Sequence, residues 1–443
     1  MTKKLEIMES NILRLRRATE ELKWAVRGFA CAPLSGSVLK ALVPRRIPPR
    51  AQDESTVRIA IISLIPYLGD LIFYLPLVDA LREANQSARI TFVGTSLASG
   101  ILSSYPGLDE VLTLPAPERA SLHNLPILRD YRRLREVAAF SQSVASTRQF
   151  DIALIPRGGA DPTFSAHAAW LMDVPRIYGF SSHLEKEREY MHHGADAMFD
   201  SAVLQKKRLH ESMRALEVGN LAGLISLDCW SESQPIRGLK ELAEIQNFSE
   251  LRAALGLQDE RPYAIIAAGA SIARRRWPPA RFRQIAERLN REAGLTVLLI
   301  GAGNEGPLAE EIATGLEPQT RNITGELNLL QLICLLNRAT LFLGNDSGPG
   351  HIAGALGVPT FSLNPYPANA KPDHHQSPAR NRPIGPAVVV LQPTEFLSPC
   401  KTECISGNLH CLGQIQVEEV WDAIISASGV WEARIVEGIH RHS

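Results

Sequence analysis

The sequence is poor in cysteine, carries no net charge and contains no long apolar run. Six cysteines among 443 residues are too few for a disulfide-stabilised scaffold and are typical of a reducing compartment. No uninterrupted apolar run reaches the roughly 20 residues that a membrane-spanning helix requires, and the N-terminus lacks the apolar region of a signal peptide. The sequence therefore disfavours disulfide-rich secreted proteins and integral membrane proteins, and we expect a cytoplasmic location.

The zero net charge hides an uneven distribution along the chain. Residues 1–50 carry eleven Lys or Arg and four Glu, whereas the rest carries 36 basic and 43 acidic residues. The composition, 45% hydrophobic and 21% charged, is that of a globular protein, and 443 residues suggest two domains of about 150 to 200 residues each. A basic segment on an acidic body predicts an anionic partner, for which the inner membrane surface is one candidate.

Apolar residues recur three and four positions apart over residues 5–29, with one polar break at Thr19. This a/d pattern predicts a helix over residues 1–30. Three roles stay open for it: packing on its own domain, forming a homo-oligomeric coiled coil through residues 5–29, or making a peripheral membrane contact. Residues 42–56 contain three prolines and predict a linker, so residues 1–56 form a separate N-terminal segment.

From Val57 onward, short apolar runs alternate with helical patterns. The predicted strands are 57–64, 89–93, 110–114 and 151–156 in the first half and 263–268, 296–300 and 340–343 in the second. Such alternation is typical of doubly wound parallel sheets. We therefore predict an α/β protein with two Rossmann-like domains, residues 57–245 and residues 246–430, followed by a tail over 431–443. A helix over 417–427 ends the second domain.

The most informative stretch is Gly344–His351, which follows the last of these strands and opens a helix of small residues. At such a junction the unpaired backbone N–H groups and the helix dipole attract an anion. The backbone around Ser347 and Gly348 would hold phosphates. Asp346 can accept hydrogen bonds from hydroxyl groups, and His351 lies one helical turn further along. The stretch therefore predicts a nucleotide-sugar site.

The run N-D-S-G-P-G-H-I-A-G-A-L-G-V-P over residues 345–359 resembles the signature of glycosyltransferase family 9, the ADP-heptose:lipopolysaccharide heptosyltransferases. The resemblance covers residues 57–430. It implies a GT-B fold, in which two Rossmann-like domains face a cleft and a C-terminal helix crosses back onto the N-terminal domain. It also implies an inverting, metal-independent glycosyltransferase that requires no cofactor. Its donor would be ADP-heptose, and its acceptor a lipopolysaccharide core or related glycan at the inner membrane.

Asp70 follows the first predicted strand, in the turn Leu68-Gly69-Asp70. Asp is favoured at the N-cap of a helix, so one interpretation of this residue is structural. The turn is also similar to the L-G-D turn of the family, whose Asp is the general base. Inverting transfer needs a base that takes the proton of the acceptor hydroxyl. The resemblance therefore implies that Asp70 is catalytic.

A second strand-to-helix junction carries Ser271 and Arg275 before Trp277-Pro278. Its backbone N–H groups face a ligand, and the family has a small hydroxyl residue and a K-R-W-P run there. With Trp277-Pro278 aligned, Arg275 takes the place of the family lysine and would neutralise the departing diphosphate, with a planar fork instead of a point charge. The alternative interpretation is a solvated basic surface.

Three further candidates rest on the resemblance. Glu305 follows a glycine-rich loop and matches the acidic residue that binds the ribose hydroxyls. Leu327 falls where the family contacts adenine. Arg157 is an acceptor-side candidate, because Pro156-Arg157 replaces the commoner acidic-Gln pair, and this departure leaves the acceptor open.

Near the C-terminus, Cys400, Cys404, His410 and Cys411 lie within twelve residues of one another. Three thiols and one imidazole can form a tetrahedral metal site. Their spacing is not that of a paired C-x-x-C zinc site, and it does not clearly match the cysteines through which the autotransporter branch of the resembling family binds iron. The sequence therefore favours structural thiols without a metal.

Two other functions stay open. The first is a glycosyltransferase that acts on a protein or a small molecule, which would suit the Pro156-Arg157 departure and the additional helix. The second is a non-catalytic nucleotide-sugar-binding scaffold that acts through the N-terminal helix. An NAD-dependent enzyme is disfavoured because no G-x-G-x-x-G follows the first strand, and no nucleic acid partner is expected.

Overall fold

The chain divides into two compact units, residues 1–230 and residues 231–443. The computed structural model describes residues 36–47, 56–115, 126–157, 161–205, 210–257, 261–402 and 404–440. The helix predicted over residues 1–30 lies outside this part of the chain, and so do the oligomer and membrane contacts expected of it. The units meet in the sequence at Trp230 rather than at residue 245, because α8 (Arg237–Ala243) packs against α12 (Leu329–Arg338) of the second unit.

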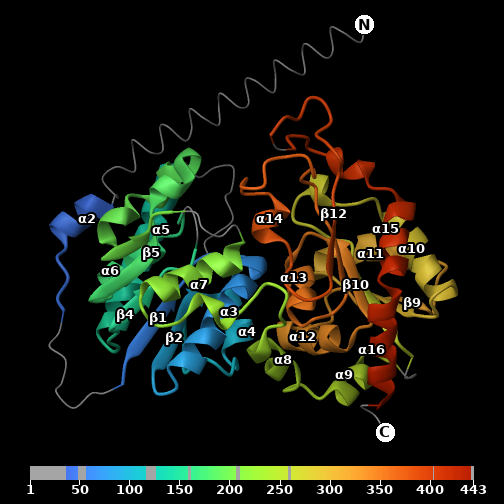
Figure 1. Cartoon of the computed structure of the whole chain (residues 1–443), viewed down its shortest axis with the longest axis horizontal. Helices are drawn as coiled ribbons and strands as arrows, with labels where there is room; N and C mark the ends of the chain where they lie inside the picture. Colours follow the sequence, from blue (N-terminus) through green and yellow to red (C-terminus); the bar gives the residue numbers. More distant parts are fainter. Residues whose placement is uncertain are drawn as a thin grey trace, which may run out of the picture. The chain divides into compact units, whose positions relative to one another are not determined.

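The first unit is built on a six-stranded parallel sheet with the order β3-β2-β1-β4-β5-β6 (Figure 1). Its strands are β1 (Arg58–Ile62), β2 (Arg89–Thr95), β3 (Glu110–Leu114), β4 (Ile152–Leu154), β5 (Arg176–Phe180) and β6 (Ser201–Val203). Its helices are α2 (Gly36–Leu42), α3 (Leu68–Ala84), α4 (Ser96–Leu102), α5 (Pro126–Ala145), α6 (Ser165–Leu171) and α7 (Glu211–Leu221), with the 3-10 segments η2 (Ser182–His192), η3 (Ala195–Met198) and η4 (Leu227–Cys229). α3 packs against α7, and α5 packs against α6.

The second unit repeats this plan with the order β12-β11-β10-β7-β8-β9. Its strands are β7 (Tyr263–Ala267), β8 (Thr296–Leu299), β9 (Thr320–Asn322), β10 (Leu341–Asn345), β11 (Thr360–Leu363) and β12 (Val388–Leu391). Its other helices are α9 (Phe248–Ala254), α10 (Pro279–Arg291), α11 (Gly306–Ala313), α13 (Gly348–Ala355), α14 (Pro378–Asn381), α15 (Val417–Ser426) and α16 (Ser428–His440), with η5 (Ala273–Arg275), η6 (Gly303–Glu305) and η7 (Cys411–Gln414).

The two sheets share one topology. Numbered from its own first strand, each has the order 3-2-1-4-5-6, which is that of the Rossmann fold. The order reverses between β1 and β4 in the first sheet and between β7 and β10 in the second. Ligands of open α/β sheets bind outside the carboxyl ends of the strands at such switch points. Each unit therefore has one preferred position for a site.

All seven predicted strands are present, and the structure adds β5, β6, β9, β11 and β12. The predicted strands are apolar runs buried on both faces, as β1 and β7 illustrate. Four of the five additional strands, β5, β6, β9 and β11, contain polar residues or glycine and so show no continuous apolar run. Their pairing with a neighbouring strand makes them strands.

The C-terminal helices pack on the second unit. Trp421 of α15 joins the core that β7, β8 and β10 form, and Arg434 of α16 donates to the carbonyl groups of Asn337 at 2.7 Å and Ala339 at 3.1 Å. The crossing of a C-terminal helix back onto the first unit, which the family resemblance implies, stays a prediction. Among the described helices, none combines the length and the apolar character that crossing a bilayer would require.

Candidate functional site

Asp70 and Arg157 meet at the switch point of the first sheet. Asp70 lies in the first turn of α3, which follows β1, and Arg157 follows β4. Arg157 Nη1 and Asp70 Oδ1 form an ion pair, with 19% and 26% of the two side chains exposed. Among the described residues, Asp70 Oδ2 has no partner. Tyr67 occupies the N-cap of α3, so the interpretation of Asp70 as a helix cap does not hold.

A buried network supports this ion pair. Tyr74, one turn after Asp70 on α3, is buried and makes side-chain hydrogen bonds with Ser63 and Arg157. Burial, reinforced by the charge of Asp70, raises the pKa of Tyr74 well above its ordinary value, so the phenol stays neutral. Burial opposes the charge of Arg157, but Asp70 and Glu211 outweigh it and raise the pKa of the guanidinium. The guanidinium of Arg157 therefore stays charged.

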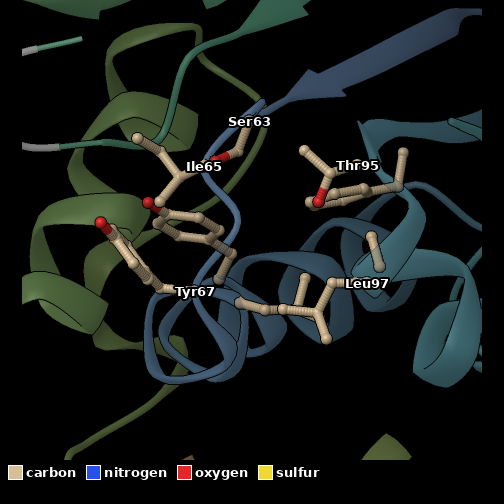
Figure 2. A pocket seen from close by; sticks show the side chains of 9 residues that line it. Ser63, Ile65, Tyr67, Thr95 and Leu97 are labelled. Carbon is tan, nitrogen blue, oxygen red and sulfur yellow. The ribbon is translucent and has the colours of Figure 1, made fainter. Parts of the chain in front are cut away.

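A small pocket opens beside the start of α3 (Figure 2). Ser63, Ile65 and Tyr67 line it from the segment between β1 and α3, and Thr95 and Leu97 line it from the junction of β2 and α4. Thr95 Oγ1 is buried and has no hydrogen-bond partner in the described part of the chain, and Tyr67 is 62% exposed. The lining offers hydroxyl groups and aromatic rings and includes no basic side chain.

At the switch point of the second sheet, two hydrogen bonds hold the loop between β7 and α10 in place. At the end of β10, buried Asn345 donates through Nδ2 to the carbonyl oxygen of Ala268 at 2.7 Å. Its Oδ1 accepts from the backbone N–H of Trp277 at 3.0 Å. Because buried polar groups are costly unless paired, these bonds fix the loop that carries Ser271, which is exposed, and Arg275, which is half-buried.

Glu305 connects this loop to the next one. Its Oε2 accepts from the backbone N–H of Ala302 at 2.9 Å. A Cβ atom at Gly269 would lie 1.9 Å from Glu305 Oε1, so only glycine permits the contact. The carboxylate therefore joins the loops that follow β7 and β8. The sequence did not predict this structural contact, and the proposed role in ribose binding stays a prediction.

Leu327 lies half-buried just before Asn328, the N-cap of α12. The preceding Gly325 has a φ of +79°, which favours glycine. Its N–H donates to the carbonyl oxygen of Gly301 at 2.9 Å. The segment leading to Leu327 is thus held against the loop that carries Glu305.

The hydroxyl group of Ser347, at the start of α13, has no hydrogen-bond partner among the described residues. Ser347 occupies the N-cap position but makes no side-chain capping bond, and its Oγ is buried. An unsatisfied buried hydroxyl costs about 1–3 kcal/mol, so this group fits a ligand oxygen. Gly348 begins the helix, whose first N–H groups and dipole attract an anion. His351 Nε2 lies 3.7 Å from Asp346 Oδ1, so these two side chains face each other.

Basic side chains on the loop between β7 and α10 complete the second site. Arg274 and Arg275 lie half-buried in η5, and in the described part of the chain no carboxylate pairs with either guanidinium. Arg276 differs, because its Nε donates to the carbonyl oxygen of Ala270 at 2.8 Å. Two cations without a protein counter-ion make this loop suited to a multiply charged anion.

The four C-terminal metal-ligand candidates come together in the structure. The ligand atoms of Cys400, Cys404, His410 and Cys411 all lie within 4.8 Å of one another. The spacing along the chain did not reveal this, because the loop between β12 and α15 folds back on itself.

Sequence reasoning missed two supporting residues. Tyr74 lies four positions after Asp70, and this helical spacing places both on one face. Asn345 belongs to the motif that contains Asp346, but its role as a clamp depends on a loop distant in the sequence. The first could have been found from helical spacing, and the second could not.

Proteins with similar sequences are described as heptosyltransferases. Residues 224–407 match the sequence model of glycosyltransferase family 9 (heptosyltransferase). Lipooligosaccharide heptosyltransferase 2 of Haemophilus influenzae is 33% identical over 124 residues, which are 27% of this chain and 35% of that protein. Lipopolysaccharide heptosyltransferase 3 of Escherichia coli K12 is 22% identical over 304 residues, which are 67% of this chain and 79% of that protein. The chain thus aligns with about a third of the first relative and most of the second.

A solved structure shows the same fold. The structure described as E. coli heptosyltransferase WaaC with ADP superposes with a TM-score of 0.61 at 17% identity, covering 84% of this chain and 99% of that chain. This similarity confirms the GT-B fold that the sequence predicted.

Proposed function

The chain belongs to glycosyltransferase family 9, and from this premise we propose that it is an inverting glycosyltransferase. It moves a heptose from ADP-heptose to a lipopolysaccharide core or related glycan at the cytoplasmic face of the inner membrane. The relatives are lipopolysaccharide or lipooligosaccharide heptosyltransferases by name, and the solved relative was determined with ADP. The donor, the acceptor and the location are parts of the proposal.

One observation carries the donor half of the proposal, namely the unsatisfied hydroxyl of Ser347 at the N-terminus of α13. A diphosphate oxygen would accept its hydrogen bond and those of the first N–H groups of the helix. Arg275 would neutralise the charge that develops as the nucleoside diphosphate leaves, so the transfer step needs no metal ion. Asp346 and His351 would orient the donor, Glu305 would bind the ribose, and Leu327 would contact adenine.

Asp70 supplies the chemistry of the acceptor half. Its carboxylate takes the proton of the acceptor hydroxyl while that oxygen bonds to the anomeric carbon. The bond from this carbon to the phosphate oxygen breaks on the opposite face, and the configuration inverts. Arg157 holds Oδ1 of the carboxylate, which leaves Oδ2 for the proton. The ion pair thus acts as an oriented base.

The pocket of Figure 2 has room for about one water molecule, so it does not hold the acceptor itself. Tyr67 at the start of α3 is exposed, and its ring can cover the apolar face of a sugar that approaches Asp70. This aromatic surface supports a saccharide as the acceptor.

Thermal unfolding with ADP, UDP and GDP tests the donor assignment. A ligand that binds only the folded state stabilises it by about 2.7 kcal/mol at a hundredfold excess over Kd. We expect the largest rise in Tm with ADP, a clearly smaller rise for Ser347→Ala, and an unchanged rise for Ser426→Ala, an exposed serine at the end of α15. A larger rise with UDP or GDP would contradict the adenosine assignment.

Transfer assays test the acceptor. With ADP-heptose as donor, we expect product on lipopolysaccharide that lacks its outer core heptose, and none on a soluble protein extract. Transfer to protein alone would overturn the proposed acceptor and support the alternative that Arg157 left open.

A further inference from the structure

The segment between β12 and α15 gathers three thiols and one imidazole at a single point. The ligand atoms of Cys400, Cys404, His410 and Cys411 lie within 4.8 Å of one another. His410 Nδ1 lies 3.5 Å from Cys400 Sγ and 3.3 Å from Cys411 Sγ. All three cysteines are buried, and Phe396 packs against them.

We propose that this cluster binds one structural zinc ion through three thiolates and the Nδ1 atom of His410. In a tetrahedral site with Zn–S of about 2.3 Å and Zn–N of about 2.05 Å, sulfur and nitrogen lie about 3.5 Å apart. The two separations that involve His410 are close to this value. Soft thiolates with imidazole in tetrahedral array are the ligand set typical of zinc.

Backbone N–H groups face two of the three sulfur atoms. The backbone N–H of Ile405 donates to Cys400 Sγ, and that of Leu397 donates to Cys411 Sγ. Donors of this kind stabilise negative sulfur and orient it toward a metal. Four protein ligands also leave no position for substrate or water, so the site is structural rather than catalytic.

A disulfide would engage only two of the four groups in this cluster. A bond between any two of the three cysteines would leave one buried thiol and the imidazole without a use. Cys400, Cys404 and Cys411 are free thiols. A zinc ion engages all four groups, which explains why the histidine lies among them.

The zinc site would stabilise the loop that supports the second switch point. In the described part of the connection between β12 and α15, the only regular segment is the short η7, and long connections without regular structure are uncommon in compact domains. The carbonyl oxygen of Ile415, four residues after Cys411, accepts from Trp277 Nε1 at 3.0 Å and Arg281 Nη1 at 2.5 Å. Trp277 belongs to the loop that carries Arg275. Metal binding therefore stabilises folding of this unit and anchors that loop.

Metal analysis of the full chain, purified without chelator or metal column under reducing conditions, tests this inference. We expect about one zinc per chain in the wild-type protein, and at least about a tenfold loss in Cys404→Ser. The matched control is Cys334→Ser, which alters a buried cysteine of α12 outside the cluster and should keep its zinc. His410→Ala should lower the zinc content, and His410→Cys should restore it, since a fourth thiolate completes a tetrahedral site.

Removing the metal tests its structural role in the same samples. A zinc chelator should lower the Tm of the wild-type protein and of Cys334→Ser, and should leave the already lowered Tm of Cys404→Ser unchanged. Wild-type protein without zinc, iron in place of zinc, or equal zinc in wild type and Cys404→Ser would overturn the proposal. Fewer free thiols than cysteines after denaturation without reductant would also overturn it, in favour of a disulfide. None of these outcomes depends on glycosyl transfer.

Discussion

The two switch points of this protein share one topology but differ in whether their charged and polar side chains are paired. In the first sheet, Asp70 and Arg157 neutralise each other, and Tyr74 supports them from within the fold. In the second sheet, Ser347 and Arg275 have no protein partner among the described residues. A self-neutralised site suits an uncharged substrate that must lose a proton, whereas unsatisfied donors and cations suit an anion. The same fold can therefore bind two reactants of opposite character.

The largest expected effect concerns the base in the first site. Asp70→Asn keeps the size of the side chain but cannot accept the proton of the acceptor. We expect turnover to fall by about 10² to 10⁴, with the ADP-induced rise in Tm unchanged because ADP uses the second site. Initial rates of transfer and thermal shifts measured on the same preparation check this.

The matched control for Asp70→Asn is Asp228→Asn, which alters an exposed carboxylate of the first unit. It should retain full turnover. If Asp70→Asn also retained near-full turnover, Asp70 would be structural and the base would lie elsewhere. Full biological effect without turnover would instead favour the scaffold alternative.

The next effect concerns the unpaired cation of the second site. Arg275→Ala removes a charge-assisted contact, which is worth about 1.5–3 kcal/mol, so the KM for the donor should rise by about 10- to 100-fold and kcat should fall. Arg291→Ala, on the exposed end of α10, should change neither constant. Added Mg²⁺ or Mn²⁺ should not increase the wild-type rate. A strict requirement for either ion would show that Arg275 does not replace a metal in the transfer step.

A moderate effect should separate stability from binding in the second unit. Asn345→Ala leaves the N–H of Trp277 and the carbonyl of Ala268 without partners, at about 1–3 kcal/mol for each buried group. We expect a lower Tm together with weaker ADP binding. Asn290→Ala breaks a 2.9 Å bond to the carbonyl of Leu295, outside the switch point, and should lower Tm without weakening ADP binding. Equal ADP affinity in the two variants would show that the clamp does not organise the donor site.

The smallest effect lies at the edge of the first sheet, away from its switch point. Hydrogen bonds from Arg148 hold the pKa of Glu110 below its ordinary value, against the effect of burial. A depressed carboxyl pKa stabilises the fold above the unfolded-state pKa of about 4.3, and this contribution is lost as the pH falls through the lower folded-state pKa. Urea unfolding should therefore show Glu110→Gln slightly less stable than wild type at pH 7, and the difference should shrink as the pH is lowered through the acidic range. Turnover at pH 7 should not change, and a large loss would mean that this pair affects the acceptor site.

Sequence patterns predicted seven of the strands and the motifs at both switch points, because these signals are local. An apolar run such as β1 or β7 specifies a buried parallel strand by itself, and small residues after β10 specify a close helix start. Strands interrupted by polar residues, such as β9 and β11, were missed, because pairing with a neighbour defines them. The boundary between the units was placed at residue 245 for a similar reason, since the packing of α8 on α12 cannot be seen in the sequence of α8.

The sequence by itself determined the similarity to glycosyltransferase family 9, the tandem Rossmann-like organisation and the identity of the candidate side chains, since each depends on neighbouring residues. Tertiary structure decided which of these side chains meet. It paired Asp70 with Arg157 across 87 positions, fastened Trp277 to Asn345 across 68 positions, and brought Cys400 and Cys404 to His410 and Cys411. Contacts between distant segments depend on how the strands are ordered in each sheet, and that order is a property of the packed chain as a whole.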